Sequence, residues 1–324
     1  MQTAFVTGGT GFLGLNLVKH LRESGWRVVA MHREGSETAR LAALGAELRH
    51  ASLDDVDSLT AATPDQVDAV FHVAGDISWW KLDRVRQERV NVGGTKNVLE
   101  AAITRHAKCF VHTSSVAAFG IDHDFLVETT PSTASTSTYG YVRTKWLGEE
   151  EVKKAAKKGL RAVIMNPSHI VGPLDQSSWG RLFFMLRDGK VPGIPPGSAS
   201  FCHSTEVARA HVAAVERGRP GEQYLLGGSD ATYAELATIM AELVGVKPPK
   251  PLPALVLKAI GRVSEWASYV TRKEPDLTAG SADLACRRWR VDSSKAVREL
   301  GYRAVPLRQM VEDSYRWLKD EKLI

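Results

Sequence analysis

The chain has 324 residues, of which 44% are hydrophobic and 24% are charged, and its formal net charge is +5. This length suffices for two domains, or for one large domain with an added lobe. The composition is typical of a soluble globular protein, and no apolar run approaches the ~20 residues of a membrane span. Basic residues alternate with acids, as in "EEEVKKAAKK", which argues against a nucleic-acid-binding surface.

The N-terminus and the cysteines bear on where the protein resides. "MQTAFVTGG" has no basic region followed by a long apolar stretch, so we expect no signal peptide. The three cysteines, Cys109, Cys202 and Cys286, are odd in number and widely spaced, which favours buried thiols in a reducing compartment. The histidines show no metal-ligand spacing. We therefore expect a cytoplasmic protein without a bound metal ion.

The first half of the chain alternates short β-branched runs with longer helical patterns. We expect strands at 3–8, 27–32, 68–75, 108–115 and 160–168. We expect helices at 12–25, 36–45, 53–63, 84–105 and 139–158. Buried strands that alternate with amphipathic helices predict a parallel sheet covered by helices on both faces.

After Pro167 the pattern changes, and residues 172–203 predict mostly loop with a short helix near 179–188. Further expected elements are a helix at 204–218 with Ser204 as its N-cap, a strand at 222–228, and helices at 232–244, 253–271 and 305–320. We expect residues 1–166 and about 204–228 to form a dinucleotide-binding domain. About 167–203 and 229–324 would then form a smaller C-terminal substrate-binding lobe.

The segment 251–270 has an amphipathic helical pattern, which suits either a lid over an apolar substrate or contact with a membrane surface. Its basic face carries only Lys258 and Arg262, so we favour a lid or packing role.

"VTGGTGFLG" places Gly8, Gly11 and Gly14 three residues apart, directly after a strand and at the start of a helix. Glycine permits the tight turn and lets the backbone approach a pyrophosphate, and the helix N-terminus offers free amide donors. This context predicts a Rossmann-type doubly wound α/β fold that binds a dinucleotide. The loop residues expected to contact the cofactor are Gly8, Thr10, Gly11, Phe12, Leu13 and Gly14.

The second strand ends in "AMHREGS", where enzymes that select NAD usually carry an acid. His32 holds that place and Arg33 follows it. A guanidinium suits the 2′-phosphate of NADP and gains nothing specific from a bare ribose. We therefore expect NADP in preference to NAD.

"STYGYVRTKWLGEE" (137–150) contains two tyrosines and a lysine. On a helix, residues four apart lie on the same face. Tyr141 and Lys145 have that spacing, whereas Tyr139 is six positions from the lysine. The pattern therefore pairs Tyr141 with the Lys145 ammonium.

The motifs "TGGTGFLG", "VFHVAG", "NVGGTKNVLEAA", "HTSS", "YGYVRTK" and "NPSHIVGP" resemble those of the extended short-chain dehydrogenase/reductases (NAD(P)-dependent epimerase/dehydratase-like proteins). The chain is most similar to the branch of dihydroflavonol reductases and 3β-hydroxysteroid dehydrogenase-like proteins. "ARAHVAAVERGRPGEQYLLGG" and "DSSKAVRELGY" extend the resemblance almost to the end. These motifs are specific for fold and cofactor class, and they do not identify the substrate.

The resemblance implies a reaction centre of Ser115, Tyr141 and Lys145. Tyr141 would exchange a proton with the substrate oxygen, and Ser115 would hold that oxygen. Lys145 and the oxidised nicotinamide would lower the pKa of the phenol, and Lys145 would also bind the nicotinamide ribose. Tyr139 would pack or line the site.

The resemblance also implies further cofactor contacts. Ser52 and Leu53 would flank the adenine, although Ser52 replaces the acid of the family pattern, which puts that contact in doubt. Asn91 opens a helix, and a structural role with an added active-site role is expected. The remaining contacts are expected from Val73, Ala74, Gly75, Pro167, Ser168 and Ile170.

Aromatic residues are the candidates for the substrate side. Trp79 and Trp80 follow the fourth strand, at the carboxyl edge where ligands collect, and His169 and Trp179 would lie opposite. The alternative is that these residues complete a core or a dimer contact. The resemblance further implies a small-molecule substrate and a homodimer formed through the helices near 88–105 and 139–158.

Three functions compete. The first is an NADP-dependent reductase/dehydrogenase of a ketone or secondary alcohol on a fairly apolar molecule. The second is a nucleotide-sugar epimerase or dehydratase with tightly bound NAD, for which Arg181, Arg187 and Arg209 are candidate diphosphate ligands. The third is a non-catalytic NADP-binding redox sensor that signals through a partner. The intact Ser115, Tyr141 and Lys145 favour the first.

Overall fold

The computed structural model describes all 324 residues, and a seven-stranded parallel sheet forms its centre. The strand order is β10-β7-β5-β4-β1-β2-β3, and every neighbouring pair is parallel. The strands are β1 (Thr3–Thr7), β2 (Arg27–His32), β3 (Glu47–His50), β4 (Ala69–His72), β5 (Phe110–Thr113), β7 (Ala162–Pro167) and β10 (Gln223–Leu226). The predicted α/β doubly wound sheet is confirmed.

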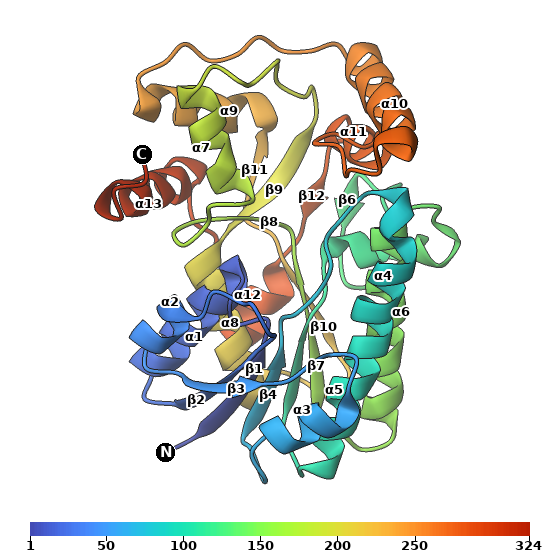
Figure 1. The fold of residues 1–324 in the computed structure, drawn as a ribbon, viewed down its shortest axis with the longest axis vertical. Helices are drawn as coiled ribbons and strands as arrows, with labels where there is room; N and C mark the ends of the chain where they lie inside the picture. The colour runs from blue at the N-terminus through green and yellow to red at the C-terminus, as the bar shows by residue number, and fades with distance from the viewer.

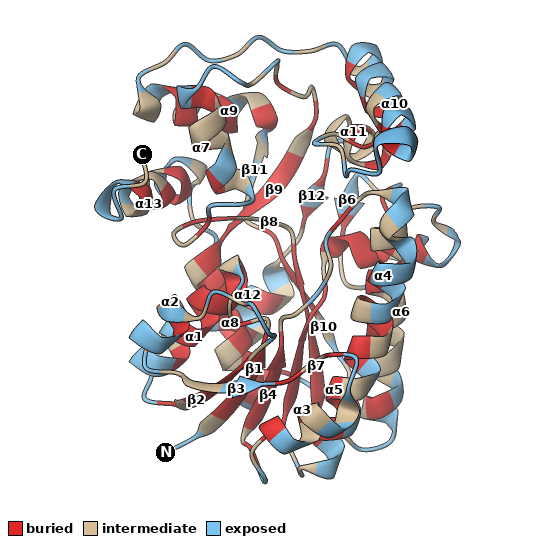
Figure 2. Cartoon of the chain, viewed as in Figure 1, coloured by how far each residue is buried: buried red, intermediate tan, exposed pale blue.

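Helices cover both faces of this sheet (Figure 1). One face carries α1 (Phe12–Glu23), α2 (Ala39–Ala43), α8 (Ser204–Arg217) and α12 (Ser294–Leu300), and the other carries α3 (Val56–Ala62), α5 (Gly94–Thr104) and α6 (Gly140–Lys157). Side chains alternate between the two faces along each strand. Ala4 and Val6 accordingly pack in the core beside α1 and α8, while Phe5 packs in the core beside α3 and α5. Figure 2 shows this buried centre.

A smaller lobe lies beyond the carboxyl ends of the central strands (Figure 1). A three-stranded sheet of β8 (His169–Val171), β9 (Ser198–His203) and β11 (Ser229–Thr232) supports its core. The helices packed with it are α7 (Trp179–Arg187), α9 (Tyr233–Val244) and α13 (Leu307–Asp320). Beside this core lie α10 (Ala254–Thr271), α11 (Ala279–Ala285) and the paired strands β6 (Phe125–Leu126) and β12 (Arg290–Val291).

Several elements differ from the sequence prediction. The expected helix over 84–105 is divided into α4 (Arg84–Glu88), a π-helical turn (Arg89–Gly93) and α5. The expected loop over 172–203 ends in strand β9. Ser204 is the first residue of α8 and not its N-cap, because the side chain of His203 accepts the hydrogen bond from the Thr205 amide.

The cysteines, the side chains that can bind metal ions and the helix lengths bear on the expectations from composition. All three cysteines are free thiols, and Cys109 and Cys202 are buried while Cys286 is partly exposed. Among the His, Cys, Asp and Glu side chains, no group of three or more is placed to hold a metal ion. None of the helices combines the length and the apolar character needed to cross a membrane.

Candidate active site

The glycine turn between β1 and α1 leaves no room for side chains. Gly8 has φ +71°, and a Cβ on it would lie 2.5 Å from the Ala74 nitrogen. A Cβ on Gly14 would lie 2.0 Å from the Gly8 oxygen. The backbone N–H groups of Phe12 and Leu13 donate to no other group of the chain, and no acidic residue occupies the first turn of α1. Close backbone approach with free amides at a helix N-terminus fits a pyrophosphate.

The end of β2 presents cationic and aromatic groups. Arg33 is exposed and forms no ion pair or side-chain hydrogen bond, and the His32 ring lies 5.8 Å from that of His50 on β3. On the neighbouring strand β3, Glu47 is paired with Arg49 of the same strand and with an arginine of β2. An exposed guanidinium that forms no ion pair fits an added phosphate.

Ser52 and Leu53, which the resemblance assigns to the adenine, lie in the turn between β3 and α3. The Ser52 hydroxyl accepts a hydrogen bond of 3.3 Å from the Asp54 amide, so it serves the turn before α3. The Leu53 side chain packs against Gly94 of α5, and the Leu53 oxygen accepts from Asn97 at 2.7 Å.

Ser115, Tyr141 and Lys145 converge at the carboxyl end of β5. The Ser115 side chain interacts with the Tyr141 phenol, and its oxygen accepts from the Ala117 amide at 3.1 Å. Lys145 is buried, and its Nζ donates to the Thr113 backbone oxygen at 3.1 Å. Burial lowers the pKa of Lys145 to about 8, against the opposing effect of nearby carboxylates.

The pKa of Tyr141 differs from the sequence-based expectation. Burial raises it above the ordinary value, and the contact with Ser115 offsets this only in part. The Lys145 ammonium is directed at the Thr113 oxygen rather than at the phenol, so the protein alone does not supply the lowering. At neutral pH the phenol therefore keeps its proton, which is the state that a general acid requires.

The loop that follows β4 packs against the residues of the reaction centre. A Cβ on Gly75 would lie 3.2 Å from the Lys145 Nζ and 3.3 Å from the Asn91 Oδ1. Asn91 sits in the π-helical turn, where its Oδ1 accepts from the Asp76 amide at 2.7 Å and its Nδ2 donates to the Asp76 oxygen at 2.9 Å. Asn91 thus fixes the loop that follows β4 and places Val73, Ala74 and Gly75 beside the glycine turn.

The residues after β7 leave one polar atom without a partner. The Ser168 amide donates to the Leu226 oxygen at 3.0 Å, but the buried Ser168 hydroxyl has no hydrogen-bond partner in the chain. Pro167 is buried in β7, and Ile170 packs against the core beside α1. A buried hydroxyl without a partner is uncommon in folded proteins, and a bound cofactor could satisfy this one.

The tryptophans after β4 have different environments. The Trp79 ring lies 5.3 Å from the Tyr141 ring and 5.9 Å from the Tyr139 ring. The Tyr139 hydroxyl donates to Asp283 of α11 at 2.9 Å, and burial, together with this contact, raises the pKa of Tyr139 to about 12. Trp80 turns toward α10, where its Nε1 donates to the Ser268 hydroxyl at 2.7 Å. Only Trp79 is in ring contact with the reaction centre.

His169 and Trp179 belong to an aromatic cluster in the smaller lobe. Their rings are 5.6 Å apart, and both contact Phe201 and Tyr233. Burial lowers the pKa of His169 to about 4, which keeps the ring neutral. These contacts agree with the alternative in which large aromatics complete a core.

Two residues beneath the centre were not predicted. Glu149 is buried one turn after Lys145, and its carboxylate accepts from the Asn166 Nδ2 at 2.5 Å and from the Gln223 Nε2 at 2.7 Å. Asn166 also donates to the Ser115 backbone oxygen at 3.0 Å. The sequence contained one signal for Glu149, its spacing of four residues from Lys145 on the same helix face.

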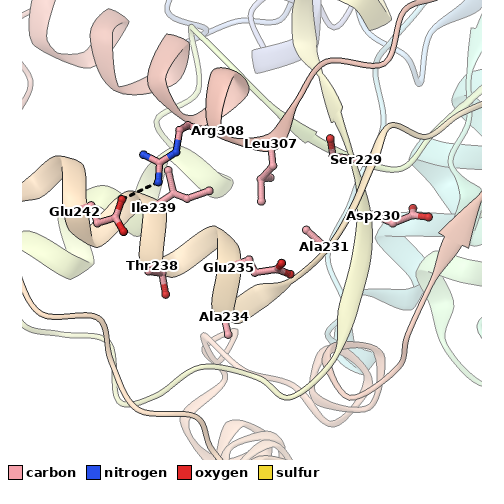
Figure 3. Close-up of a pocket in the computed structure, with 10 residues that line it drawn as sticks. All are labelled: Ser229, Asp230, Ala231, Ala234, Glu235, Thr238, Ile239, Glu242, Leu307 and Arg308. Carbon is pink, nitrogen blue, oxygen red and sulfur yellow. Dashed lines mark hydrogen bonds and ion pairs between the residues drawn. The ribbon is translucent and has the colours of Figure 1, made fainter.

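A pocket of about 510 Å³ lies elsewhere, between β11, α9 and the start of α13 (Figure 3). An ion pair of 2.8 Å between Arg308 and Glu242 closes one side of it. None of the predicted site residues lines this pocket, so its size does not mark the reaction centre.

Comparison with known proteins agrees with this geometry. The model of the family described as "NAD dependent epimerase/dehydratase family" matches residues 4–227. A putative dihydroflavonol 4-reductase of Synechocystis is 30% identical over 98% of this chain and 94% of its own length. Sterol demethylase protein B of Methylococcus capsulatus is 31% identical over the full length of both chains.

Two solved structures share the whole fold. The crystal structure of gox2253 superposes with a TM-score of 0.85 at 33% identity and covers all of both chains. A nucleoside-diphosphate-sugar epimerase from Pseudomonas aeruginosa superposes with a TM-score of 0.81 at 26% identity, over 100% of this chain and 99% of its own. The relatives therefore include proteins named as reductases and others named as epimerases.

Proposed function

The chain belongs to the NAD dependent epimerase/dehydratase family of NAD(P)-dependent enzymes, and we propose that it is an NADP-dependent reductase. It transfers a hydride between the nicotinamide and a carbonyl or secondary alcohol of a fairly apolar small molecule. One observation carries the proposal: the Tyr141 side chain contacts Ser115, and its ring lies 5.3 Å from the apolar Trp79 ring.

The chain's own residues handle the proton. When bound, the cofactor supplies the hydride that reduces the carbonyl carbon. The Tyr141 hydroxyl gives its proton to the carbonyl oxygen, and the Ser115 hydroxyl donates a hydrogen bond to the same oxygen as negative charge develops on it. Lys145, held by the Thr113 oxygen, binds the nicotinamide ribose and places positive charge near the phenolate that remains. Oxidation of the alcohol reverses these steps.

Arg33 supports the choice of NADP. Its guanidinium is exposed and unpaired at the end of β2, where a 2′-phosphate would gain a charge-assisted contact. The amides of the glycine turn would hold the pyrophosphate. Other contacts would come from Ser52, Leu53, Gly75, Asn91 and Ser168.

The surroundings of Tyr141 support an apolar substrate. Trp79 and Tyr139 pack beside it, and a Cβ on Gly280 of α11 would lie 3.1 Å from the Trp79 ring, so the smaller lobe reaches the reaction centre. We propose that residues of about 167–203 and 229–324 determine which molecule binds. The name of the Methylococcus relative, sterol demethylase protein B, agrees with such a substrate.

A nucleotide-sugar epimerase is the second candidate, favoured by the similarity to the Pseudomonas epimerase. The arginines that could hold a sugar-nucleotide diphosphate are each engaged in an ion pair. Arg181 pairs with Asp276, Arg187 with Asp188, and Arg209 with Glu206. Because none of these arginines is free to bind a diphosphate, the reductase is the better supported candidate.

Turnover measurements separate the two candidates. Purified protein is assayed with NADPH and with NADH against aliphatic, aryl and polycyclic ketones, and with UDP-hexoses as the matched alternative. The proposal predicts NADPH oxidation that depends on an apolar ketone. A preference for NADH contradicts the choice of NADP. Hexose epimerisation by tightly held NAD that does not exchange with free NAD establishes the second candidate.

We also propose that the enzyme forms a homodimer through the helices near 88–105 and 139–158, which are α5 with the π-helical turn before it and α6. Helices α5 and α6 lie side by side on one face of the central sheet. An ion pair of 3.8 Å between Lys96 and Glu151 joins them. Light scattering during size-exclusion chromatography tests this, since a mass of one chain contradicts it.

A further inference from the structure

The helix α10 buries its more polar side and exposes its apolar side. Its side toward the protein buries Gly261, Glu265 and Ser268 together with a single leucine, Leu257. Its other side exposes an apolar stripe of Leu255, Val256, Ile260, Val263, Trp266 and Val270. Helices of globular proteins bury their apolar side, so this orientation requires a cause.

Hydrogen bonds to the buried polar residues fix the orientation of α10. The Glu265 carboxylate accepts from the Ala279 amide at 2.9 Å and pairs with Lys81 at 3.3 Å. The Ser268 hydroxyl accepts from the Trp80 Nε1 at 2.7 Å. Rotation of the helix to bury its stripe would turn Glu265 and Ser268 to solvent and leave the Ala279 amide and the Trp80 Nε1 without acceptors, and buried donors without partners are costly. The apolar stripe is therefore held outward, and much of α10 is coloured as exposed in Figure 2.

The stripe is strongly exposed along the whole helix. Leu255 is 83% exposed, Val263 66%, Trp266 72% and Val270 76%. Scattered exposed hydrophobic residues are normal on protein surfaces, whereas a contiguous apolar patch marks an interaction site.

Unpaired cations border this stripe. Arg262 is exposed on the flank of α10, and Arg272 and Lys273 are exposed at its C-terminal end. None of the three takes part in an ion pair, although 25 such pairs occur in the protein. The acid that follows them, Glu274, accepts a hydrogen bond from the Ser78 hydroxyl at 2.6 Å. Apolar surface and free positive charge together suit an anionic lipid surface.

We propose that α10 docks the protein onto an anionic lipid bilayer, with the apolar stripe at the boundary between headgroups and acyl chains. Trp266 lies within the stripe, and tryptophan is favoured at that depth. A second copy of the chain suits the face less well. In a twofold contact through α10, Arg262 and its symmetry mate would both lie near the interface, and like charges oppose such pairing. The inference does not depend on the reaction that the enzyme catalyses.

Vesicle sedimentation tests the proposal with the full-length protein. Vesicles of phosphatidylcholine alone are compared with vesicles that also contain phosphatidylglycerol. We expect binding to the anionic vesicles with a blue shift of tryptophan fluorescence. The double variant Val263→Ser/Trp266→Ser should bind at least tenfold more weakly, because each buried apolar side chain contributes substantially to membrane affinity. Both residues are exposed, so the fold should be unchanged, which circular dichroism and the midpoint of thermal unfolding check.

Two further variants make the outcome decisive. Arg262→Gln/Lys273→Gln should weaken binding to anionic vesicles by about fivefold for each cation and leave any binding to neutral vesicles unchanged. Val297→Ser, at a 48% exposed position of α12, is the matched control and should bind like the original protein. Failure of the protein to bind anionic vesicles, or equal binding by the stripe variant, overturns the proposal. A concentration-dependent dimer that the stripe variant abolishes would assign the face to self-association instead.

Discussion

Asn166 and Ser115 are joined by a hydrogen bond of 3.0 Å from the Asn166 Nδ2 to the Ser115 backbone oxygen. The same nitrogen donates to Glu149 at 2.5 Å, and Glu149 lies one turn after Lys145 on α6. These contacts connect the helix that carries the tyrosine and lysine to the strand end that carries the serine. The relative positions of the three side chains therefore depend on a buried polar network as well as on the backbone.

Removal of the Asn166 amide should reduce catalysis more than cofactor binding. Asn166→Ala frees the Ser115 oxygen, so we expect kcat to fall about 10- to 100-fold because a small displacement misaligns the serine. The Kd for NADPH should change little. Unfolding free energy should fall by about 1–3 kcal/mol, since buried partners lose their donor.

Gln223→Ala is the matched control for this prediction. Gln223 donates to the same Glu149 carboxylate and does not contact Ser115. Its loss should lower stability by a similar amount with kcat nearly unchanged. Equal falls in kcat for Asn166→Ala and Gln223→Ala would mean that the network only stabilises the fold.

The pH dependence should report Lys145. Because its pKa is lowered to about 8, the side chain is charged below that pH and neutral above it. The single-turnover rate of ketone reduction should therefore decrease as the pH rises through about 8, while Tyr141, whose pKa is raised, keeps its proton. In Lys145→Arg the charge persists, and the alkaline decrease should move to higher pH. The same decrease in both proteins would assign it to another group.

The glycine turn should not tolerate a methyl group at position 14. A Cβ there would lie 2.0 Å from the Gly8 oxygen, so Gly14→Ala must displace the turn that holds the pyrophosphate. We expect a loss of NADPH binding and a lower midpoint of thermal unfolding. Gly9→Ala is the control, because its Cβ would meet only side-chain carbons at 3.4–3.5 Å. Titration with NADPH measures the affinity of both variants. An affinity of Gly14→Ala equal to that of the original protein would contradict the prediction.

Arg33 should discriminate between the two cofactors. Arg33→Ser should raise the Kd for NADPH about 10- to 100-fold, as expected for the loss of a charge-assisted contact, and should leave the Kd for NADH unchanged. Arg49→Ser is the comparison, because the Arg49 guanidinium is already paired with Glu47. Fluorescence titration of the original protein and both variants with NADPH and with NADH measures these constants. An equal effect of Arg33→Ser on both cofactors would remove the basis for expecting NADP.

The sequence predicted the central sheet because its strands are buried runs separated by amphipathic helices. It missed β3, whose residues "ELRH" form a polar edge strand that pairs only with β2. It also missed the interruption before α5, where Asn91 turns toward Asp76. Such polar side-chain contacts depend on residues distant in the chain, and local propensity does not contain them.

In the candidate active site, too, local sequence patterns were predictable and contacts between distant residues were not. The spacing of four residues placed Tyr141 and Lys145 on one helix face, and the glycine motif located the turn. The pKa of Tyr141 could not be predicted, because burial by Trp79 and the direction of the Lys145 amine depend on the folded surroundings. For the segment 251–270 the sequence favoured a lid or packing role over contact with a membrane, since the pattern alone does not show that Glu265 and Ser268 are the buried residues.

The central claim is that the Tyr141 hydroxyl delivers the proton, and the rate of a single turnover with NADPH and an active ketone tests it most directly. Tyr141→Phe should slow this rate by about 10²–10⁴-fold, the usual contribution of a general acid, with NADPH binding retained. Tyr139→Phe, which loses only the hydrogen bond to Asp283, should react at nearly the original rate. Reaction of Tyr141→Phe at the original rate, or a comparable loss in Tyr139→Phe, would contradict the account.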